Sequence, residues 1–313
     1  MTAAPPRVVV AGEALIDLVP HGTGALAELS PRRGGGPYNT AVALGRLGVP
    51  TAFCSRVSTD PFGEALLDGL HTAGVDTSLV GRGPEPTTLA AATLGADGSA
   101  RYTFYVEGTA DRLFTAPAAL PPTVRAVCLG TCSLVLEPGA TQYEGLLRRC
   151  ASAGLLTMVD PNVRAAIVPD EAAYRKRFAS WLPEVTLLKV SAEDARWLTG
   201  ADDPADPARH WLTQGPRAVV VTDGAAGITA YTRHAGTVRV AAVPVPVRDT
   251  IGAGDTVNAA LLHWLAGRNA LDADALDGLG PDDWRAALGH AARAAAITCG
   301  RPGADPPYAA ELG

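Results

Sequence analysis

The sequence predicts an α/β protein with three layers, in which helices cover both faces of a central, mainly parallel sheet, together with a small β-sheet lid. The first observation is that strand-like and helix-like segments alternate from Val124 onward, an order typical of parallel sheets. The second is a pair of strands, 87–94 and 101–106, around the hairpin signal Asp97-Gly98. Because a hairpin does not fit that alternation, we assign it to a separate sheet, the lid.

Composition and charge are those of a soluble globular protein. The 313 residues suffice for one large domain, with 47% hydrophobic and 19% charged residues. A net charge of -6 argues against nucleic acid or an anionic membrane as the main partner. No apolar run approaches the roughly 18 residues needed to span a bilayer, and the N-terminus has no secretion signal, so we expect a cytoplasmic protein.

The five cysteines do not form a recognisable metal site. Cys128 and Cys132 are separated by a spacing that metal ligands do not use. We therefore expect buried free thiols.

The first part of the chain is expected to supply the first core strand and the lid. Residues 7–12 form a β-branched run that ends in glycine, which predicts a buried strand, and residues 13–20 continue in extended form. We expect the lid to consist of about residues 13–36 and 85–110. A polar loop (21–33), a helix (40–48), a strand (51–57) and a helix (61–73) complete this part.

The second part carries most of the alternation. The predicted strands are 124–129, 155–159, 185–190, 218–222 and 228–232, and the predicted helices are 139–153, 174–182, 193–199 and 282–298. Residues 201–207 and 269–280 are expected to be surface loops. Ligands of open parallel sheets bind beyond the carboxyl ends of the strands. The polar residues of 160–164, 189–194 and 222–227 should therefore meet at one rim.

The stretch around Gly252-Ala253-Gly254-Asp255 joins an extended segment (238–247) to an apolar, helix-compatible one (259–265). Glycines at a helix start let an anion approach free backbone N–H groups and the positive end of the helix dipole. Asp255 falls on the first helical turn. It is either an ordinary N-terminal cap or an acid placed beside a phosphate cradle, as transfer of phosphate to a hydroxyl requires.

Two polar features near the N-terminus also point to a ligand. Asp17 has apolar neighbours, where a carboxylate is unfavourable unless it is paired or faces a wet cleft. It is either a satisfied structural acid or a ligand-binding group. The run Gly34-Gly35-Gly36-Pro37-Tyr38-Asn39 allows close backbone approach, and Asn39 offers both a donor and an acceptor. No P-loop motif is present, and a dinucleotide motif is incomplete.

Together these motifs resemble the ribokinase-like (PfkB-type) carbohydrate kinases over essentially the whole chain. The N-terminal signature runs from Gly35-Gly36-Pro37-Tyr38-Asn39 to Asp60-Pro61-Phe62-Gly63, and the C-terminal one is Asp249-Thr250-Ile251-Gly252-Ala253-Gly254-Asp255 with Asn258-Ala259-Ala260. The resemblance implies one kinase domain over residues 1–313, transfer of the γ-phosphoryl group of ATP to a sugar hydroxyl with Mg²⁺, and a homodimer formed through the lid.

The resemblance also assigns site residues. It makes Asp255 the catalytic base and gives the anion hole to Gly252, Ala253 and Gly254. The sugar-binding residues are expected to be Asp17, Gly35, Gly36, Asn39, Tyr105, Asn162 and Arg164. The nucleotide-binding residues are expected to be Lys189, Ser191, Thr222, Gly224 and Gly227. Asp249 and Ile251 match positions that bind a monovalent cation such as K⁺ in several members.

One motif departs from the family pattern. Many members carry Asn-x-x-Glu in mid-chain, whereas this chain has Lys189-Val190-Ser191-Ala192-Glu193-Asp194. The shorter side chain of Asp194 favours Mg²⁺ binding through water over direct ligation. Lys189 is one of only two lysines and either faces phosphate or lies on the surface.

Fructose is the leading substrate. The segment Gly12-Glu13-Ala14-Leu15-Ile16-Asp17 and the motif Asp160-Pro161-Asn162-Val163-Arg164 resemble those of bacterial fructokinases. Val106 stands where related lids often carry arginine, and Tyr38 either narrows the pocket or packs away from it. The alternatives are a ribose, 2-keto-3-deoxygluconate or nucleoside kinase, and a non-catalytic sugar- or nucleotide-binding regulator.

Overall fold

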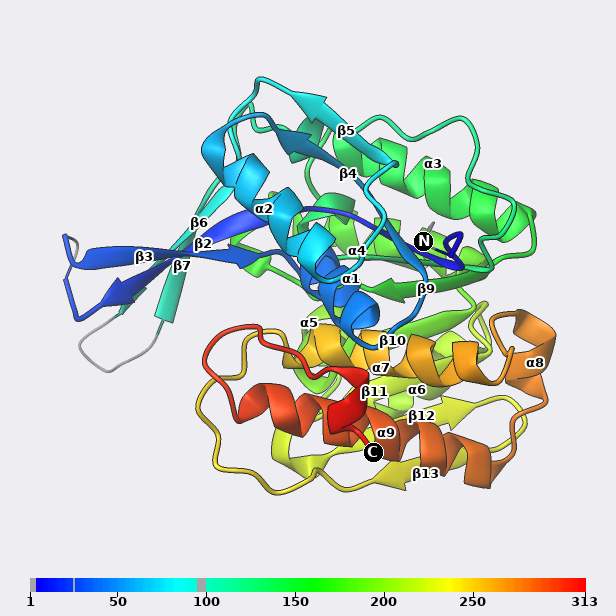
Figure 1. Cartoon of the computed structure of the whole chain (residues 1–313). Coiled ribbons are helices and arrows are strands. Elements are labelled where there is room, and N and C mark those ends of the chain that lie inside the picture. Colours follow the sequence, from blue (N-terminus) through cyan, green and yellow to red (C-terminus); the bar gives the residue numbers. More distant parts are fainter. Residues whose placement is uncertain (1–3, 25, 95–99) are drawn as a thin grey trace.

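The computed structural model describes residues 4–24, 26–94 and 100–313, which fold around one large sheet (Figure 1). Within these residues the sheet has nine strands in the order β13-β12-β11-β10-β9-β8-β1-β4-β5. All neighbours are parallel except β11–β12 and β12–β13. The strands are β1 (Val8–Ala11), β4 (Thr51–Ser58), β5 (Val80–Gly83), β8 (Ala126–Gly130), β9 (Leu156–Asp160), β10 (Leu187–Ser191), β11 (Ala218–Thr222), β12 (Ile228–Thr232) and β13 (Thr237–Val240).

Helices cover both faces of this sheet. Along β1, Val8 and Val10 belong to one apolar cluster and Val9 and Ala11 to the other, as the two-residue period of a strand requires. The first cluster includes α1 (Gly36–Arg46), α2 (Pro61–Thr72), α7 (Ala253–Gly267) and α9 (Pro281–Cys299). The second includes α3 (Gly139–Ser152), α4 (Glu171–Trp181), α5 (Ala192–Thr199) and α6 (Ala205–Leu212). The predicted three-layer arrangement is confirmed.

A smaller sheet projects from one side of the molecule as the predicted lid (Figure 1). Its order is β3-β2-β6-β7, from β2 (Leu15–His21), β3 (Glu28–Gly34), β6 (Leu89–Leu94) and β7 (Ala100–Tyr105). The polar loop predicted for 21–33 is partly wrong, because β3 pairs with β2 along its length. β3 looks like a loop in the sequence because it is an exposed edge strand that contains Pro31. The predicted Asp97-Gly98 turn lies outside the described residues.

Three other elements differ from the prediction. The strand β5 and the short helix α8 (Ala273–Asp277) were not expected, and α6 begins inside a predicted loop. Pro204 and Pro207 read as breakers in the sequence, but they stand at the N-cap and in the first turn of α6, where a proline costs no intrahelical hydrogen bond. The extended segment 238–247 forms a strand only as far as Val240.

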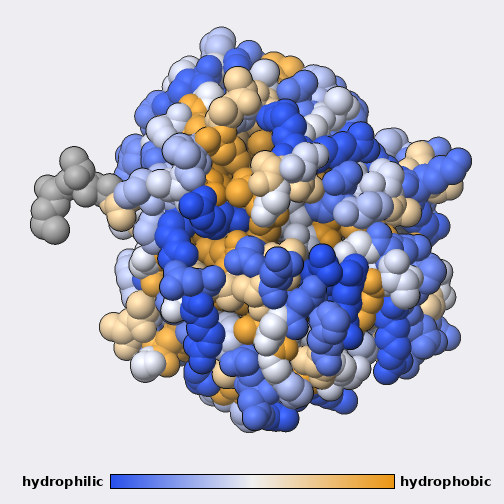
Figure 2. All heavy atoms as spheres, turned by 90° about the vertical axis from the view of Figure 1, so that its right-hand side faces the viewer, coloured by the Kyte–Doolittle hydropathy of each residue, from blue (hydrophilic) through white to orange (hydrophobic). Residues whose placement is uncertain are grey.

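Cys54, Cys128, Cys132 and Cys150 are buried free thiols, as predicted, and Cys299 is partly buried. None of the helices in the described ranges is both long and apolar enough to cross a membrane. On the face opposite the lid, hydrophilic residues are interspersed with hydrophobic ones (Figure 2).

Candidate active site

A cavity of about 1140 Å³ lies at the carboxyl ends of the parallel strands. Its lining includes lid residues such as Asp17 and Phe104, the start of α7, and the turn after β11 with the segment that follows β13. The predicted convergence of strand ends on one rim therefore holds. The cavity is large enough for two small ligands side by side, since drug-sized sites occupy about 300–1,000 Å³.

Asp255 lies in the first turn of α7 and is 7% exposed. The N-cap of this helix is Gly252, in the left-handed conformation with φ 77°, and no side chain caps the helix. The carboxylate instead accepts a hydrogen bond at Oδ2 from Asn39 Nδ2 in α1, over 2.9 Å. The interpretation of Asp255 as an ordinary helix cap is therefore wrong.

Burial raises the pKa of Asp255 to about 6. The hydrogen bond from Asn39 acts in the opposite direction, the charge of Asp160 raises the pKa further, and the charges of Lys189 and Arg164 lower it. A carboxyl group with this pKa is largely ionised at neutral pH and still accepts a proton readily, which suits a general base.

The backbone at Gly36 lies at the centre of the polar groups. A Cβ atom at this position would lie 2.5 Å from Thr131 Oγ1, 3.1 Å from Asn162 Nδ2 and 3.2 Å from Asp255 Oδ1. Only glycine fits here. Thr131 and Asn162 both have positive φ angles, 63° and 38°, and Asn162 Nδ2 donates to Thr131 Oγ1 over 3.3 Å. Such strain in a β-branched residue is rare and tends to occur at functional sites.

Thr131 and Glu13 are among the cavity residues that the sequence did not mark. Thr131 directly follows β8, so the rule that ligands meet strand ends would have identified it. Glu13 is buried and lines the cavity, and its Oε2 accepts a hydrogen bond from the Ser133 amide over 3.0 Å. Burial raises its pKa to about 7. No sequence motif marks Glu13, because the residues that bury its side chain lie far away in the sequence, near Ser133.

The expected sugar-binding residues mostly line the cavity. Asp17, Gly35, Gly36, Asn39, Asn162 and Arg164 are among the lining residues. Burial raises the pKa of Asp17 to about 6, and the charge of Arg164 opposes this effect. Gly35 has a φ of 105°, and a Cβ there would lie 2.8 Å from the Glu13 carbonyl oxygen. This position therefore requires glycine.

Arg164 contributes a guanidinium group to the cavity wall. Within the described part of the chain its guanidinium donates to the Asn162 and Val163 carbonyl oxygens and to Asn162 Oδ1, and to no acidic side chain. The group is partly buried and lines the cavity. It is therefore available to an anionic or strongly polar ligand.

Tyr105 does not line the cavity, so its assignment as a sugar-binding residue is wrong. It is 58% exposed, whereas Tyr102 and Phe104 of the same strand face the cavity. The cause is the two-residue period of β7. Phe104 lies in a row with Ala90 and Asp17 across the lid, and Tyr105 points to the other face.

Tyr38 packs away from the site. It is buried, donates a hydrogen bond from its hydroxyl to the Leu66 carbonyl oxygen over 3.1 Å, and contacts Phe53 edge-on. It does not narrow the cavity.

The residues expected to hold the nucleotide line the other part of the cavity. Thr222, Gly224 and Gly227 come from the end of β11 and the turn after it. Gly227 has a φ of 98°, and a Cβ there would lie 2.2 Å from the Val240 carbonyl oxygen. Ser191 also lines the cavity, but its hydroxyl caps α5 by accepting from the Asp194 amide over 2.9 Å.

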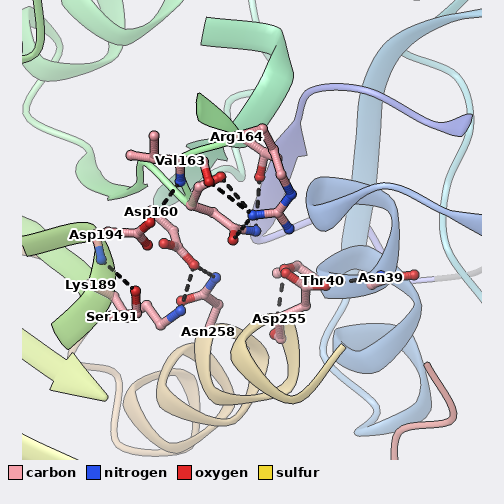
Figure 3. A network of polar contacts seen from close by, with 12 residues as sticks. Asn39, Thr40, Asp160, Val163, Arg164, Lys189, Ser191, Asp194, Asp255 and Asn258 are labelled. Atoms are coloured by element: carbon pink, nitrogen blue, oxygen red, sulfur yellow. Dashed lines mark hydrogen bonds and ion pairs between the residues drawn. The ribbon is translucent and has the colours of Figure 1, made fainter. Parts of the chain in front are cut away.

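Lys189 is neither on the surface nor unpaired. It is 3% exposed, and its Nζ donates to Asp160 Oδ2 over 2.7 Å (Figure 3). The expectation of a surface lysine is therefore wrong. Its ammonium group lies at the floor of the cavity, next to Gly254.

Asp194 fits a Mg²⁺ ion that is held mainly by phosphate oxygens and water. Asp194 lines the cavity and accepts a hydrogen bond at Oδ1 from the Val163 amide, over 3.0 Å. Burial raises its pKa. No group of three or more metal-ligating side chains occurs among the described residues. Mg²⁺ usually keeps several waters and takes one or two carboxylates plus phosphate oxygens, so a single Asp194 carboxylate is compatible with it.

Asp249 joins the segment before α7 to the segment around Gly303. Its Oδ1 accepts from the Ile251 amide over 3.0 Å and its Oδ2 from the Gly303 amide over 2.8 Å. The assignment of Asp249 and Ile251 to a monovalent cation stays a prediction.

Comparison with known proteins identifies relatives over most of the chain. Residues 5–310 match the model of the pfkB family carbohydrate kinases. A fructokinase of Rhizobium leguminosarum bv. trifolii is 39% identical over 269 residues, which are 84% of this chain and 81% of that protein. A fructokinase of Klebsiella pneumoniae is 33% identical over 280 residues, 88% of this chain and 89% of that protein. The crystal structure of a Xylella fastidiosa fructokinase with bound ATP superposes with a TM-score of 0.89 at 28% identity and covers 98% of this chain and 96% of that one.

Proposed function

This chain belongs to the pfkB family of carbohydrate kinases, and on that premise we propose that the sugar it phosphorylates is fructose. It is an ATP-dependent sugar kinase. The relatives at 39% and 33% identity are fructokinases, which supports fructose as the acceptor. The cavity side of the lid and the turn before α1 offer polar groups to a polyol, among them Asp17, Asn39 and Asn162.

The position of Asp255 is the observation that carries the mechanism. Its Oδ2 is held by Asn39, and its Oδ1 faces the point where Gly36, Thr131 and Asn162 meet. A sugar hydroxyl bound there loses its proton to Asp255 as its oxygen bonds to the γ-phosphorus of ATP. The bond from that phosphorus to the β,γ-bridging oxygen breaks, and ADP leaves with the electron pair. General base catalysis of this kind contributes about 10²–10⁴-fold.

The start of α7 stabilises the charge that develops on the transferred group. Gly252 and Gly254 present backbone N–H groups at the positive end of the helix dipole, whereas the Ala253 N–H donates to the Thr250 carbonyl oxygen over 3.2 Å. One such donor is worth about 10²–10³ in rate. Bound Mg²⁺, which Asp194 is placed to hold, would supply neutralisation of the phosphate charge.

A second substrate class is favoured by one observation. The guanidinium of Arg164, which has no carboxylate partner in the described part of the chain, would pair well with the carboxylate of an acid sugar such as 2-keto-3-deoxygluconate. Val106, however, provides no second cation from the lid. Fructose therefore stays the first candidate.

We extend this proposal to the oligomeric state of the protein. The outer face of the lid exposes Leu29 and Tyr105, which is suited to pairing with the lid of a second copy. We accordingly expect a homodimer. The cytoplasmic location and the use of K⁺ stay predictions.

An assay of ADP release tests the substrate. The purified protein is given ATP, Mg²⁺ and, in turn, fructose, ribose, 2-keto-3-deoxygluconate and a nucleoside. We expect the highest kcat/KM with fructose. A preference for 2-keto-3-deoxygluconate would transfer the assignment to the acid-sugar kinases, and absence of turnover with every acceptor would favour a binding regulator.

A further inference from the structure

Three buried polar side chains meet beneath the first turn of α7. Lys189 Nζ donates to Asp160 Oδ2 over 2.7 Å, and Asn258 Nδ2 donates to the same oxygen over 2.8 Å (Figure 3). Each of these residues is 3% exposed. They come from the end of β9, from β10 and from α7, so the cluster joins two strands of the sheet to the catalytic helix.

Within the described residues, Lys189 is the only cation paired with Asp160. The remaining oxygens, Asp160 Oδ1 and Asn258 Oδ1, are buried and accept no hydrogen bond there. A buried charge is strongly unfavourable unless it is paired. Lys189 and Asp160 therefore depend on each other for compensation.

The cluster holds α7 on both sides of Asp255. A Cβ at Gly254 would lie 2.9 Å from Lys189 Nζ, so the ammonium group packs directly against the backbone of that residue. Asn258 lies one helical turn later on the same face of the helix. Contacts just before and just after Asp255 are thus fixed by the same carboxylate, Asp160.

These contacts differ from those of a lysine that waits for phosphate. Such a lysine would present a free ammonium group to the cavity, whereas Lys189, although it lines the cavity, has a side chain only 4% exposed and an Nζ that Asp160 engages. We propose that Asp160, Lys189 and Asn258 are positioning residues that hold the first turn of α7 against β9 and β10, and so fix Asp255 and the anion-hole amides relative to both substrates. This inference rests on the proposed function and assigns the cluster a role in it.

The charges of the cluster also act on Asp255. The groups that face Asp255 are Asn39 from α1, Asp160 from β9, Arg164 from the segment after β9 and Lys189 from β10. Asp160 and Lys189 act in opposite directions on the pKa of Asp255: the charge of Asp160 raises it and the charge of Lys189 lowers it. Removal of one partner should therefore change both the geometry and the titration of Asp255.

Kinetics of three variants test the role. Lys189→Met leaves Asp160 uncompensated, and we expect kcat to fall about 100-fold, as a misplacement of about 1 Å can cause, with each KM changed by less than about threefold. The double variant Lys189→Met/Asp160→Asn removes both charges and should recover at least about tenfold of that loss. The control is Lys176→Met, which removes the other, exposed lysine and should leave turnover unchanged.

The pH profile of kcat/KM separates positioning near Asp255 from a general loss of packing. Its acid midpoint should rise in Lys189→Met, fall in Asp160→Asn and return towards the wild-type value in the double variant. Unchanged kcat in Lys189→Met would overturn the inference. So would a large rise in KM for ATP that the double variant does not relieve, because this would make Lys189 a direct phosphate ligand.

Acetylation with an amine-reactive reagent gives a readout that needs no turnover. Mass spectrometry identifies the modified lysines. We expect Lys176 to react and Lys189 to remain unmodified, with or without ATP. In Asp160→Asn, Lys189 should become reactive. Labelling of Lys189 in the wild-type protein that ATP prevents would contradict the inference. The activity of the wild-type protein on fructose tests the proposed function separately.

Discussion

The side-chain amide of Asn39 lies 2.9 Å from Oδ2 of Asp255 and donates a hydrogen bond to it. This contact joins the first turns of α1 and α7, which are far apart in the sequence. It orients the carboxylate so that Oδ1 is directed towards Gly36 and the surrounding polar groups. A residue from the expected sugar-binding segment thus holds the carboxylate that we propose as the catalytic base.

Asp255→Asn should abolish most turnover while both substrates still bind. The amide is isosteric, and it can pair with Asn39 through its oxygen, but it cannot take a proton from the sugar. We expect kcat to fall by about 10²–10⁴-fold. Steady-state ADP release gives kcat, and calorimetric titration with ATP and sugar checks binding. A kcat near that of the wild type would exclude Asp255 as the base.

Activity should fall on the acid side of about pH 6. Burial raises the pKa values of both Asp255 and Asp17 to about 6, and both carboxylates should be ionised to accept hydrogens from the sugar. Two groups that protonate together reduce kcat/KM up to about 100-fold per pH unit, and one group about tenfold. In Asp17→Asn the slope should drop to that of one group. A flat profile down to pH 5 would contradict the assignment.

The same raised pKa predicts a stability gain in Asp255→Asn. The pKa of Asp255 rises from the ordinary value of 3.8 to about 6 in the folded protein, so ionisation favours unfolding. The contribution of protonated Asp255 to the free energy of unfolding is fully present below about pH 3.8 and is lost as the pH rises through about 6. At pH 8 the variant should therefore be more stable by up to about 3 kcal/mol, and near pH 4 the difference should vanish.

Urea unfolding at the two pH values measures this difference. The matched control is Asp68→Asn, the same change at an exposed position of α2. It should alter stability at neither pH. Equal stability of Asp255→Asn and the wild type at pH 8 would show that the carboxylate carries no burial penalty.

Local pattern was enough to predict the parallel sheet, the lid and the start of α7. β-branched runs, glycines at helix starts and the order of elements all depend on neighbours in the sequence. The face of the lid sheet on which Tyr102 and Tyr105 lie was not predictable, because a shift of one residue in the register of β7 decides which of them lines the cavity. The burial of Lys189 depends on Asp160 and Asn258, which are distant in the chain. The sequence shows no periodicity for such a pairing.

The two lid tyrosines form a matched pair for mutation. Tyr102 lines the cavity and is 40% exposed, whereas Tyr105 points to the outer face. Tyr102→Ala removes a side chain of the cavity wall and should raise KM for the sugar about tenfold or more, a loss of about 1.4 kcal/mol or more. Tyr105→Ala should leave this KM unchanged and should weaken dimerisation if the lids pair. Sedimentation and steady-state kinetics measure the two effects, and the opposite pattern would restore Tyr105 as a sugar ligand.

The glycines before Asp255 should not tolerate a methyl group. In Gly252→Ala the Cβ would lie 2.7 Å from Ala304 Cβ at a backbone φ of 77°, which an alanine adopts only with strain. In Gly254→Ala it would lie 2.9 Å from Lys189 Nζ. Both changes should displace amides of the proposed anion hole, and we expect kcat to fall about 10²–10³-fold, as for loss of one such donor. The control is Gly267→Ala at the other end of α7, where a Cβ meets nothing within 4 Å and alanine favours the helix. If Gly252→Ala and Gly267→Ala turned over equally fast, the backbone at residue 252 would have no part in phosphoryl transfer.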